Sequence, residues 1–321
     1  MGPIDVVVVG GGIIGLTAAV RLQERGARVT VLAADDPERT VSTVAAAVWY
    51  PTHTDPDPRV LDWARRTYAT LTRQAAEGVP GVVLRPTRML LRHGPVELPW
   101  WAEATGDLVV RPAAPPYRAQ LRFTAPTVEM SPYLGWLRER ISAAGGRVLR
   151  HRVARLADAF VDPATSAGVA TVVNATGLAA GRLAADPAVY PVRGHIVLVA
   201  NPGLTTSVRD EDDPRGITYV HPRRHDVVLG GTYQPGRADL DAEPETAAAI
   251  RRRCVELVPE LASARVLGER IGLRPARHGG PRVESTSTGV PGQRLVHAYG
   301  HGGAGVTLAW GVADEVARLA A

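Results

Sequence analysis

The N-terminal part of the chain shows a hydrophobic pattern whose period changes from segment to segment. Ile4 to Val9 is an almost continuous run of β-branched side chains, which predicts a strand buried on both faces of a parallel sheet. Apolar residues at helical spacing from Leu16 to Arg25 predict a helix that ends at Gly26. Arg28 to Leu32 again has the pattern of a strand. The chain therefore begins with a strand, a turn, a helix and a second strand.

The turn after the first strand carries glycine at positions 10, 12 and 15. The spacing G-x-G-x-x-G between a strand and a helix is typical of dinucleotide binding. Gly10 and Gly12 would let the backbone approach a pyrophosphate, and Gly15 would let the helix lie close to the strand. The helix start, with Ile13 and Ile14, would present free N–H groups and the positive end of the helix dipole to this ligand. An ordinary glycine-rich turn is the alternative interpretation.

A carboxylate that binds the ribose is expected after the second strand of such a unit. Ala33 and Ala34 stand there, and Asp35 and Asp36 follow them. We predict that Asp35 takes this role. Alternatively, the two acidic residues cap the start of the segment that follows.

The rest of the chain alternates between short strands and helices. From His53 to Met130 the patterns are shorter and punctuated by proline, which indicates a separate layer. Further on, the pattern predicts helices over Tyr133–Ala144 and Val306–Ala320 and strands over Arg147–Leu149, Ala170–Asn174, Gly194–Ala200, Thr218–His221, Asp226–Gly231 and Leu295–Tyr299. The last strand and helix are joined by a second glycine-rich loop.

These patterns predict an α/β fold with a Rossmann-like nucleotide-binding domain and an inserted α+β domain. The nucleotide-binding domain would be discontinuous and comprise residues 1–49, 133–189 and 270–321. The inserted domain would comprise residues 50–132 and 190–269, form a mixed or antiparallel sheet and hold the substrate.

Composition excludes several classes of protein. The chain of 321 residues has one cysteine, Cys254, so that internal disulfides, zinc fingers and iron–sulfur clusters are excluded, and we predict no metal site. It contains no lysine, which excludes lysine Schiff-base enzymes and P-loop proteins. Redox chemistry would therefore depend on a bound cofactor.

Charge and hydropathy indicate a soluble globular protein, and we expect it to stay in the cytoplasm. The net charge is +5, but the arginines are mixed with acidic residues, so we expect no nucleic-acid partner, and Arg251 to Arg253 are interpreted as a solvated helix face. No apolar run approaches the roughly 20 residues of a membrane span. We see no signal peptide at the start.

Six segments carry a resemblance to the D-amino-acid oxidase family of flavoproteins. They are VVVVGGGIIGLTAA near the start, VNATG at 173–177, TYVHP at 218–222, VVLGGTY at 227–233, GERIGLRPAR at 268–277 and VHAYGHGGAGVTLAWG at 296–311. The resemblance implies a Rossmann-like domain that binds FAD non-covalently. It also implies oxidation of a D-amino acid by oxygen to a 2-oxo acid, ammonia and hydrogen peroxide.

The resemblance also implies which residues bind the substrate. Arg274 would hold the substrate carboxylate, a role that suits the planar fork of a guanidinium. Tyr219 would reach the same carboxylate, Tyr233 would be a second active-site tyrosine, and the carbonyl of Gly303 would accept a hydrogen bond from the amine. As an alternative, Arg274 or its neighbour Arg277 pairs with Glu269 or Glu284.

Further residues are expected to contact FAD. The helix that follows the second glycine-rich loop would point its N-terminus at the flavin, where Thr307 would donate a hydrogen bond. His301 is interpreted as shaping this loop, with a role as general base the alternative. The predicted FAD contacts outside the first turn are Val153, Thr176, Gly177, Gly302, Gly303, Gly305, Val306 and Thr307.

The substrate range is predicted from a departure from the family pattern. The D-aspartate branch typically has arginine where this chain has Tyr233, which favours neutral or hydrophobic D-amino acids. The loop expected before Tyr219, Arg209 to Gly216, is short. The C-terminus carries no peroxisomal signal, so we expect a bacterial cytoplasmic enzyme, with a homodimer as the family expectation. Two alternatives are a glycine- or sarcosine-type FAD amine oxidase and a non-catalytic dinucleotide-binding redox sensor.

Overall fold

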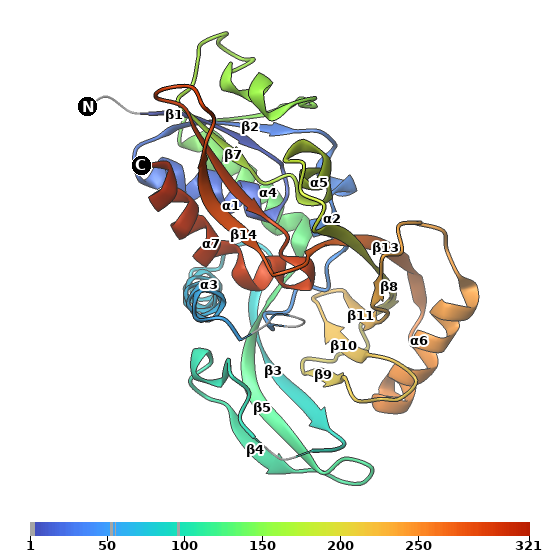
Figure 1. Cartoon of the computed structure of the whole chain (residues 1–321). Coiled ribbons are helices and arrows are strands. Elements are labelled where there is room, and N and C mark those ends of the chain that lie inside the picture. The colour runs from blue at the N-terminus through green and yellow to red at the C-terminus, as the bar shows by residue number, and fades with distance from the viewer. Residues whose placement is uncertain (1–3, 52–53, 55, 95–96) are drawn as a thin grey trace.

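The computed structural model describes residues 4–51, 54, 56–94 and 97–321, and within these its strands form two sheets (Figure 1). The α-helices are α1 (Ile13–Glu24), α2 (Val41–Val44), α3 (Pro58–Ala76), α4 (Met130–Ala143), α5 (Ala180–Leu183), α6 (Pro244–Leu257) and α7 (Gly305–Ala320). Short 3-10 turns are η1 (Pro37–Arg39), η2 (Ala102–Ala104), η3 (Leu156–Phe160), η4 (Gly177–Ala179), η5 (Pro259–Leu261) and η6 (Gly302–Ala304).

The first sheet has six strands in the order β14-β15-β7-β1-β2-β6 within the described residues. These strands are β1 (Asp5–Val9), β2 (Arg28–Ala33), β6 (Arg147–Arg150), β7 (Thr171–Asn174), β14 (Arg282–Ser287) and β15 (Arg294–Tyr299). All neighbours pair in parallel except β14 and β15. β1, the first strand in the chain, is one of the two central strands, and its neighbours β2 and β7 come from segments far apart in sequence.

Both faces of the first sheet are covered, which explains the continuous run of valines in β1. The helices α1 and α7 pack against each other and against the sheet on one face, and α4 packs beside α1. On the other face, Phe160 and Val169 from the segment after β6 pack against Val7 and Val9. The prediction of a doubly covered parallel sheet is confirmed.

The second sheet is mixed and has nine strands in the described part of the chain. Eight follow the order β12-β8-β11-β10-β9-β3-β5-β4, and β13 pairs with β8. They are β3 (Val82–Leu91), β4 (Val109–Pro112), β5 (Ala119–Val128), β8 (Val189–Ala200), β9 (Ser207–Asp210), β10 (Thr218–Pro222), β11 (Asp226–Gly230), β12 (Gln234–Pro235) and β13 (Val266–Arg277). All pairs are antiparallel except β3 and β9.

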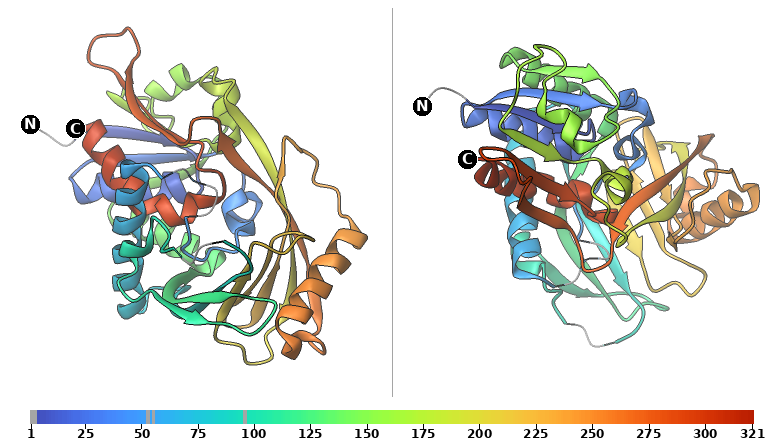
Figure 2. Two further views of the ribbon diagram at one scale, coloured as in Figure 1. Left: turned by 60° about the horizontal axis from the view of Figure 1, so that its bottom comes forward. Right: turned by 45° about the horizontal axis from the view of Figure 1, so that its top comes forward.

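Side chains of this sheet alternate between a helix and the interior of the molecule, as the period of two in a strand requires. α6 lies along the outer face in both views of Figure 2. Val220 packs with Ile250 of α6, whereas Tyr219 packs on the opposite face with Ile196 and Val228. The inner face is therefore the one available to a ligand.

Some local predictions were wrong. The segment 53–130 contains a helix of 19 residues and two strands of 10 residues, longer than its pattern indicated. The helix α3 packs on α7, which covers the first sheet, as well as on β3 and β5 of the second sheet. Pro86 of β3 and Pro126 of β5 are paired with residues of the neighbouring strand and do not interrupt either strand. β13 spans the domain boundary predicted at residue 270, and the division into domains stays a prediction.

Two further corrections concern arginines. Arg209, expected in a loop, lies in β9 and is buried. Arg253, expected on a solvated helix face, is also buried, because its guanidinium donates to Thr218 Oγ1 at 3.1 Å and to the carbonyl of Gly231 at 3.3 Å. Through the guanidinium of Arg253, α6 is thus bonded to the first residue of β10 on the outer face of the sheet.

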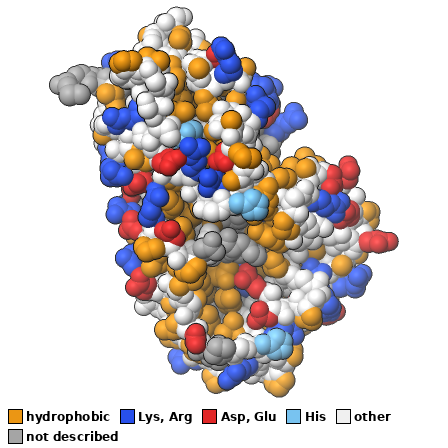
Figure 3. Space-filling view, viewed as in Figure 1, with side chains coloured by type: hydrophobic (Ala, Val, Ile, Leu, Met, Phe, Trp, Pro, Cys, Tyr) orange, Lys and Arg blue, Asp and Glu red, His pale blue; other side chains and the backbone are white. Residues whose placement is uncertain are grey.

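The surface charges are mixed. On the face drawn in Figure 3, arginine and acidic side chains are interspersed over both halves. None of the helices in the described segments combines the length and the apolar character that crossing a bilayer would need.

Asp186 joins the ends of two strands that lead to the interior cavity. Its Oδ2 accepts from Arg277 Nε of β13 and from the Tyr299 hydroxyl of β15, both at 2.8 Å. The backbone N–H of Ala188 donates to Oδ1 at 3.0 Å. These donors, Arg277 first, lower the pKa of Asp186 to about 2, from an ordinary value of about 3.9.

We expect Asp186→Asn to lower the free energy of unfolding at pH 7 by about 1–3 kcal/mol, since buried donors lose a charged acceptor. Because the pKa of Asp186 is lower in the folded state, its contribution is complete above about pH 5 and is lost as the pH falls toward 2. The stability difference between wild type and variant, measured by urea unfolding across this range, should therefore shrink on acidification. A difference that stays constant from pH 7 to pH 3 would contradict the assignment.

Candidate active site

A cavity of about 590 Å³ lies between the glycine-rich turns of the first sheet and the inner face of the second. The first sheet contributes the turn after β1, the end of β2 and the loop after β15. The second sheet contributes residues of β8, β9, β10 and β13. With the exception of Gly15, the substrate- and cofactor-contacting residues predicted from the sequence line this cavity. They are Gly10, Gly12, Ile13, Ile14, Asp35, Val153, Thr176, Gly177, Tyr219, Tyr233, Arg274, Gly302, Gly303, Gly305, Val306 and Thr307.

The turn between β1 and α1 requires glycine at two positions. Gly10 has φ +127°, and a Cβ there would lie 2.2 Å from the carbonyl oxygen of Ala175, at the end of β7. A Cβ on Gly15, which is not itself in the cavity wall, would lie 1.9 Å from the carbonyl oxygen of Gly10. The predicted close packing of strand, turn and helix is therefore present.

Ser42 of α2 contacts this turn and was not predicted from the sequence. Its Oγ accepts a hydrogen bond from the backbone N–H of Ile13 at 3.0 Å, although 29 positions separate the two residues. The residue also lines the cavity. A serine that caps a helix from a distant segment has no signature in the local pattern.

Asp35 lies at the rim of the cavity and forms an ion pair with Arg152 at 2.7 Å. The alternative of an N-cap is not what the structure shows, because Asp36 is the residue that precedes η1, and it makes no capping hydrogen bond. Val153 follows Arg152 and is buried. Thr176 donates to Asn174 Oδ1 at 2.7 Å, which fixes the turn after β7.

The loop after β15 leads into α7 and differs from its prediction in one detail. The hydroxyl of Thr307 donates to the carbonyl of Tyr50 at 2.9 Å, and it accepts from the N–H of Tyr50 at 3.0 Å. The hydroxyl proton of Thr307 therefore makes a hydrogen bond to Tyr50 and not to a ligand. The N–H groups in the first turn of α7 have no partner within the helix, so the backbone at Gly305, Val306 and Thr307 still presents donors to this part of the cavity wall.

His301 precedes this turn and is buried. Burial lowers its pKa to about 4, so the ring is neutral at pH 7. Its backbone forms a bridge with Ala276 of β13. These contacts agree with a residue that shapes the loop, and that role stays a prediction.

Arg274 lies in β13 with its guanidinium in the cavity. The guanidinium lies over Gly194, where a Cβ would approach its Nη1 to 2.2 Å, and Nη1 donates to the carbonyl of Thr232 at 3.2 Å. Within the described residues no carboxylate lies at ion-pair distance from Arg274.

The alternative partners predicted for this arginine are occupied elsewhere. Glu269 pairs with His195 at 2.5 Å, and Glu284 pairs with Arg282 at 2.7 Å. The neighbouring Arg277 pairs with Asp186. The predicted pairing of Arg274 or Arg277 with Glu269 or Glu284 is therefore wrong.

Two tyrosines accompany Arg274. Tyr219 is buried, and burial raises the pKa of its hydroxyl, an effect that the charge of Arg274 opposes. The hydroxyl therefore stays protonated at pH 7 and can donate a hydrogen bond. The ring of Tyr233 lies 5.9 Å from the Cζ of Arg274. The structure thus brings together at one end of the cavity the three side chains predicted to bind the substrate.

Comparison with known proteins agrees with this geometry. A family model described as FAD dependent oxidoreductase matches residues 5–319. The chain belongs to the FAD-dependent oxidoreductase family.

The chain is also similar to named oxidases over almost its whole length. It is 46% identical to a D-amino-acid oxidase of Rubrobacter xylanophilus, over 98% of this chain and 95% of the relative. It is 44% identical to a D-amino-acid oxidase of Streptomyces coelicolor, over 98% and 96% of the two chains. A human D-aspartate oxidase is 35% identical over 98% and 94%.

Solved structures show the same fold. Glycine oxidase from Geobacillus kaustophilus superposes with a TM-score of 0.82 at 21% identity, over 100% of this chain and 95% of the other. Glycine oxidase from Bacillus cereus gives a TM-score of 0.81 at 21% identity, over 98% and 94%. The predicted fold class is confirmed.

The cavity fits the FAD of this family. The N-termini of two long helices, α1 and α7, lie at the same cavity, at Ile13 and at Gly305. Both helix ends favour a ligand of negative charge. Between β1 and α1, Gly10, Gly11 and Gly12 line the cavity, so no side chain there separates the backbone from a ligand.

The sequence pattern did not reveal a polar wall beside Tyr219. Arg209 of β9, His221 of β10 and Glu211 all line the cavity. Burial, together with the charge of Arg209, lowers the pKa of His221 well below its ordinary value, so this ring is neutral at pH 7. The family motif TYVHP includes His221, which was the one signal for it in the sequence.

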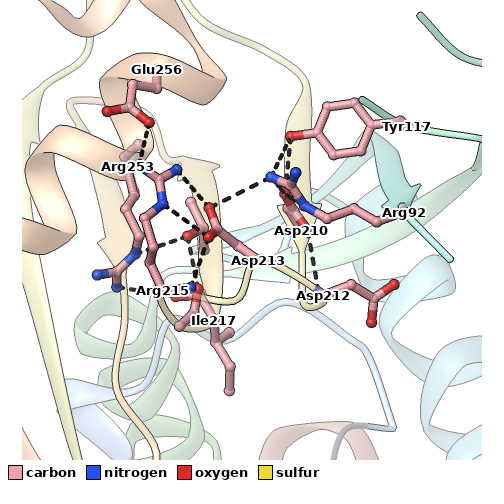
Figure 4. Close-up of polar contacts among 12 residues, drawn as sticks. Arg92, Tyr117, Asp210, Asp212, Asp213, Arg215, Ile217, Arg253 and Glu256 are labelled. Atoms are coloured by element: carbon pink, nitrogen blue, oxygen red, sulfur yellow. Dashed lines mark hydrogen bonds and ion pairs between the residues drawn. The ribbon is translucent and has the colours of Figure 1, made fainter. Parts of the chain in front are cut away.

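The segment between β9 and β10 is held by a network of charged groups (Figure 4). Arg92 donates to Asp210 Oδ2 at 2.6 Å, and the hydroxyl of Tyr117 donates to the same oxygen at 2.9 Å. Asp213 pairs with Arg215 at 2.8 Å, and the pKa of Asp213 is lowered to about 2, chiefly by that arginine. Both ends of the segment that contains Glu211 are therefore fixed.

Proposed function

We propose that this family member is a D-amino-acid oxidase. The observation that carries the proposal is Arg274, a guanidinium in the cavity with no carboxylate partner among the described residues, beside Tyr219 and Tyr233. A carboxylate is the natural partner of such a group. The two bacterial relatives at 46% and 44% identity, both named D-amino-acid oxidase, support the same reaction.

FAD would be held without a covalent bond by the residues around the glycine turns. Gly10, Gly12, Gly15, Ile13 and Ile14 would form the pyrophosphate site, with Asp35 and Val153 toward the nucleotide end. The residues along the flavin would be Thr176, Gly177, Gly302, Gly303, Gly305, Val306 and Thr307. Bound FAD supplies the acceptor for the hydride of the substrate and passes the electrons to oxygen. The products would be a 2-oxo acid, ammonia and hydrogen peroxide, the imine having been hydrolysed by water.

The residues of this chain would act by orientation. Arg274 and the hydroxyl of Tyr219 bind the substrate carboxylate, and the carbonyl of Gly303 accepts a hydrogen bond from the amine. These contacts hold the Cα–H in one direction, and positioning of this kind supplies a large part of the catalysis. No side chain needs to remove a proton from Cα.

The same contacts would select the D-enantiomer. With the carboxylate and the amine fixed, one substituent of Cα remains in the direction of the reaction. In a D-amino acid this substituent is the hydrogen, and inversion of the centre would place the side chain there.

The organisation and setting of the enzyme belong to the same proposal. Residues 1–49, 133–189 and 270–321 would form the FAD-binding domain, and residues 50–132 and 190–269 the substrate domain. The position of the cavity between two sheets supports such a division. A bacterial cytoplasmic location and a homodimer stay predictions.

The purified protein should show the absorbance bands of bound flavin, and anaerobic D-alanine should bleach them whereas L-alanine should not. After air is admitted, hydrogen peroxide and pyruvate should form in equal amounts. A protein that stays colourless and inactive after FAD is added would refute the proposal. Faster oxidation of glycine or sarcosine than of D-alanine would favour the amine-oxidase alternative, and bound flavin that no amino acid bleaches would favour a redox sensor.

A further inference from the structure

Two arginines flank Tyr219 in the cavity, and they differ in their partners. Arg274 reaches it from β13, and its charge is one of those that act on the tyrosine hydroxyl. Arg209 pairs directly opposite Tyr219 in the antiparallel ladder of β9 and β10, and its Cζ lies 5.7 Å from the centre of the tyrosine ring. The cavity wall therefore carries two guanidinium groups, on either side of Tyr219.

Arg209 is desolvated and held in place by aromatic contact. Its side chain is 7% exposed, and its Cζ lies 3.8 Å from the centre of the Tyr50 ring. Within the described residues its Nε has no hydrogen-bond partner. A buried cation of this kind is stable only beside a negative charge.

Glu211 supplies that charge. One of its carboxylate oxygens, Oε1, accepts from Arg209 Nη2, and the other, Oε2, accepts from the hydroxyl of Tyr50 at 3.0 Å. The flanking Asp210 and Asp213 are fixed by Arg92, Tyr117 and Arg215 (Figure 4). The ion pair of Arg209 and Glu211 is thus built into the cavity wall on a fixed segment.

We infer that the ion pair of Arg209 and Glu211 forms the side-chain end of the substrate site, and that Glu211 excludes D-amino acids with a carboxylate side chain. This inference rests on the proposed function. Arg274 takes the α-carboxylate because it has no acidic partner in the described chain. The second arginine cannot take a side-chain carboxylate, because Glu211 already neutralises it.

The exclusion follows from charge. A carboxylate brought next to Glu211 in a desolvated site meets a like charge and loses its hydration, both of which oppose binding. An amide of the same shape carries no charge and can donate to Glu211. D-Asparagine and D-aspartate have nearly the same shape and differ in the charge of the side chain, which is the property that Glu211 would discriminate.

In the wild-type enzyme, we expect kcat/KM for D-asparagine to exceed that for D-aspartate at least about tenfold, which is about 1.4 kcal/mol. In Glu211→Gln, this ratio should fall at least about tenfold, because Arg209 is left without its partner and a substrate carboxylate can replace it. The affinities for succinate and butyrate can be measured from their effect on the flavin absorbance. In the same variant, the affinity for succinate should rise relative to that for butyrate.

Two matched variants separate the local effect from general charge. Asp212→Asn removes one negative charge at the adjacent, exposed position and should leave the D-asparagine to D-aspartate ratio unchanged. Arg209→Met combined with Glu211→Gln should abolish the gain for D-aspartate. If Glu211→Gln does not fold, the wild-type ratio still tests the inference, because a ratio near one overturns it.

The outcomes distinguish this inference from the proposed function. A wild-type enzyme that oxidises no D-amino acid refutes the function itself. A wild type that oxidises D-alanine but uses D-aspartate as well as D-asparagine overturns the role of Glu211. An equal gain for D-aspartate in Asp212→Asn and Glu211→Gln overturns it also.

Discussion

Arg274→Met is expected to lower kcat/KM for D-alanine by roughly 10²- to 10³-fold, which corresponds to about 3–4 kcal/mol. The variant would leave the substrate carboxylate without its cation in a desolvated site. Arg274→Lys should recover only part of the loss, because an ammonium cannot form the two parallel hydrogen bonds of a guanidinium. Steady-state kinetics with peroxide detection measures both effects, and flavin absorbance shows that the variants retain FAD.

Arg270→Met is the control for this prediction. Arg270 lies on the same strand, is exposed and donates to the carbonyl of Glu269. Its substitution removes one positive charge from β13 but none from the cavity wall, so kcat/KM should stay within about twofold. If Arg274→Met binds FAD and keeps kcat/KM within about threefold of the wild type, Arg274 is not the carboxylate site.

Gly15→Ala is expected to destabilise the protein by about 3 kcal/mol or more and to impair FAD binding. Its Cβ would lie 1.9 Å from the backbone oxygen of Gly10, which no rotation of a side chain can relieve. The thermal midpoint should fall by roughly 4 °C or more, and the purified variant should contain less flavin per chain. Both can be measured on one preparation, by thermal unfolding and by absorbance.

Gly135→Ala provides a matched comparison with the opposite sign. Gly135 lies inside α4, and no atom lies within 4 Å of a Cβ at that position. Alanine there should stabilise the helix by up to about 1 kcal/mol and leave the flavin content unchanged. Equal midpoints for the Gly15 and Gly135 variants would show that the close approach at Gly15 does not limit stability.

The features that local pattern could predict are those that depend on neighbours in sequence. The run of β-branched residues before Gly10 identified β1, and the glycine spacing identified the turn. The family motifs placed Arg274, Tyr219 and Tyr233 in one site, and the cavity contains all three. In each case the information lies within a few residues or within a motif.

The features that escaped prediction depend on distant partners. Arg209 is polar and lies in a strand, and its burial is offset by Glu211 and Tyr50, the second of which is far away in sequence. Arg253 is buried because Thr218 and Gly231 accept its hydrogen bonds. Hydrophobic periodicity assigns charged residues to the surface, so buried arginines with such partners are missed.

The order of strands in the first sheet has a consequence for biosynthesis. β1 is the first strand made, but its neighbour β7 and then β15 leave the ribosome only after residues 174 and 299 have been added. The turn at Gly10 and the start of α7 can face each other only when translation is almost complete. A nascent chain is therefore expected to capture its flavin at release, and chains that terminate before β15 should emerge without it.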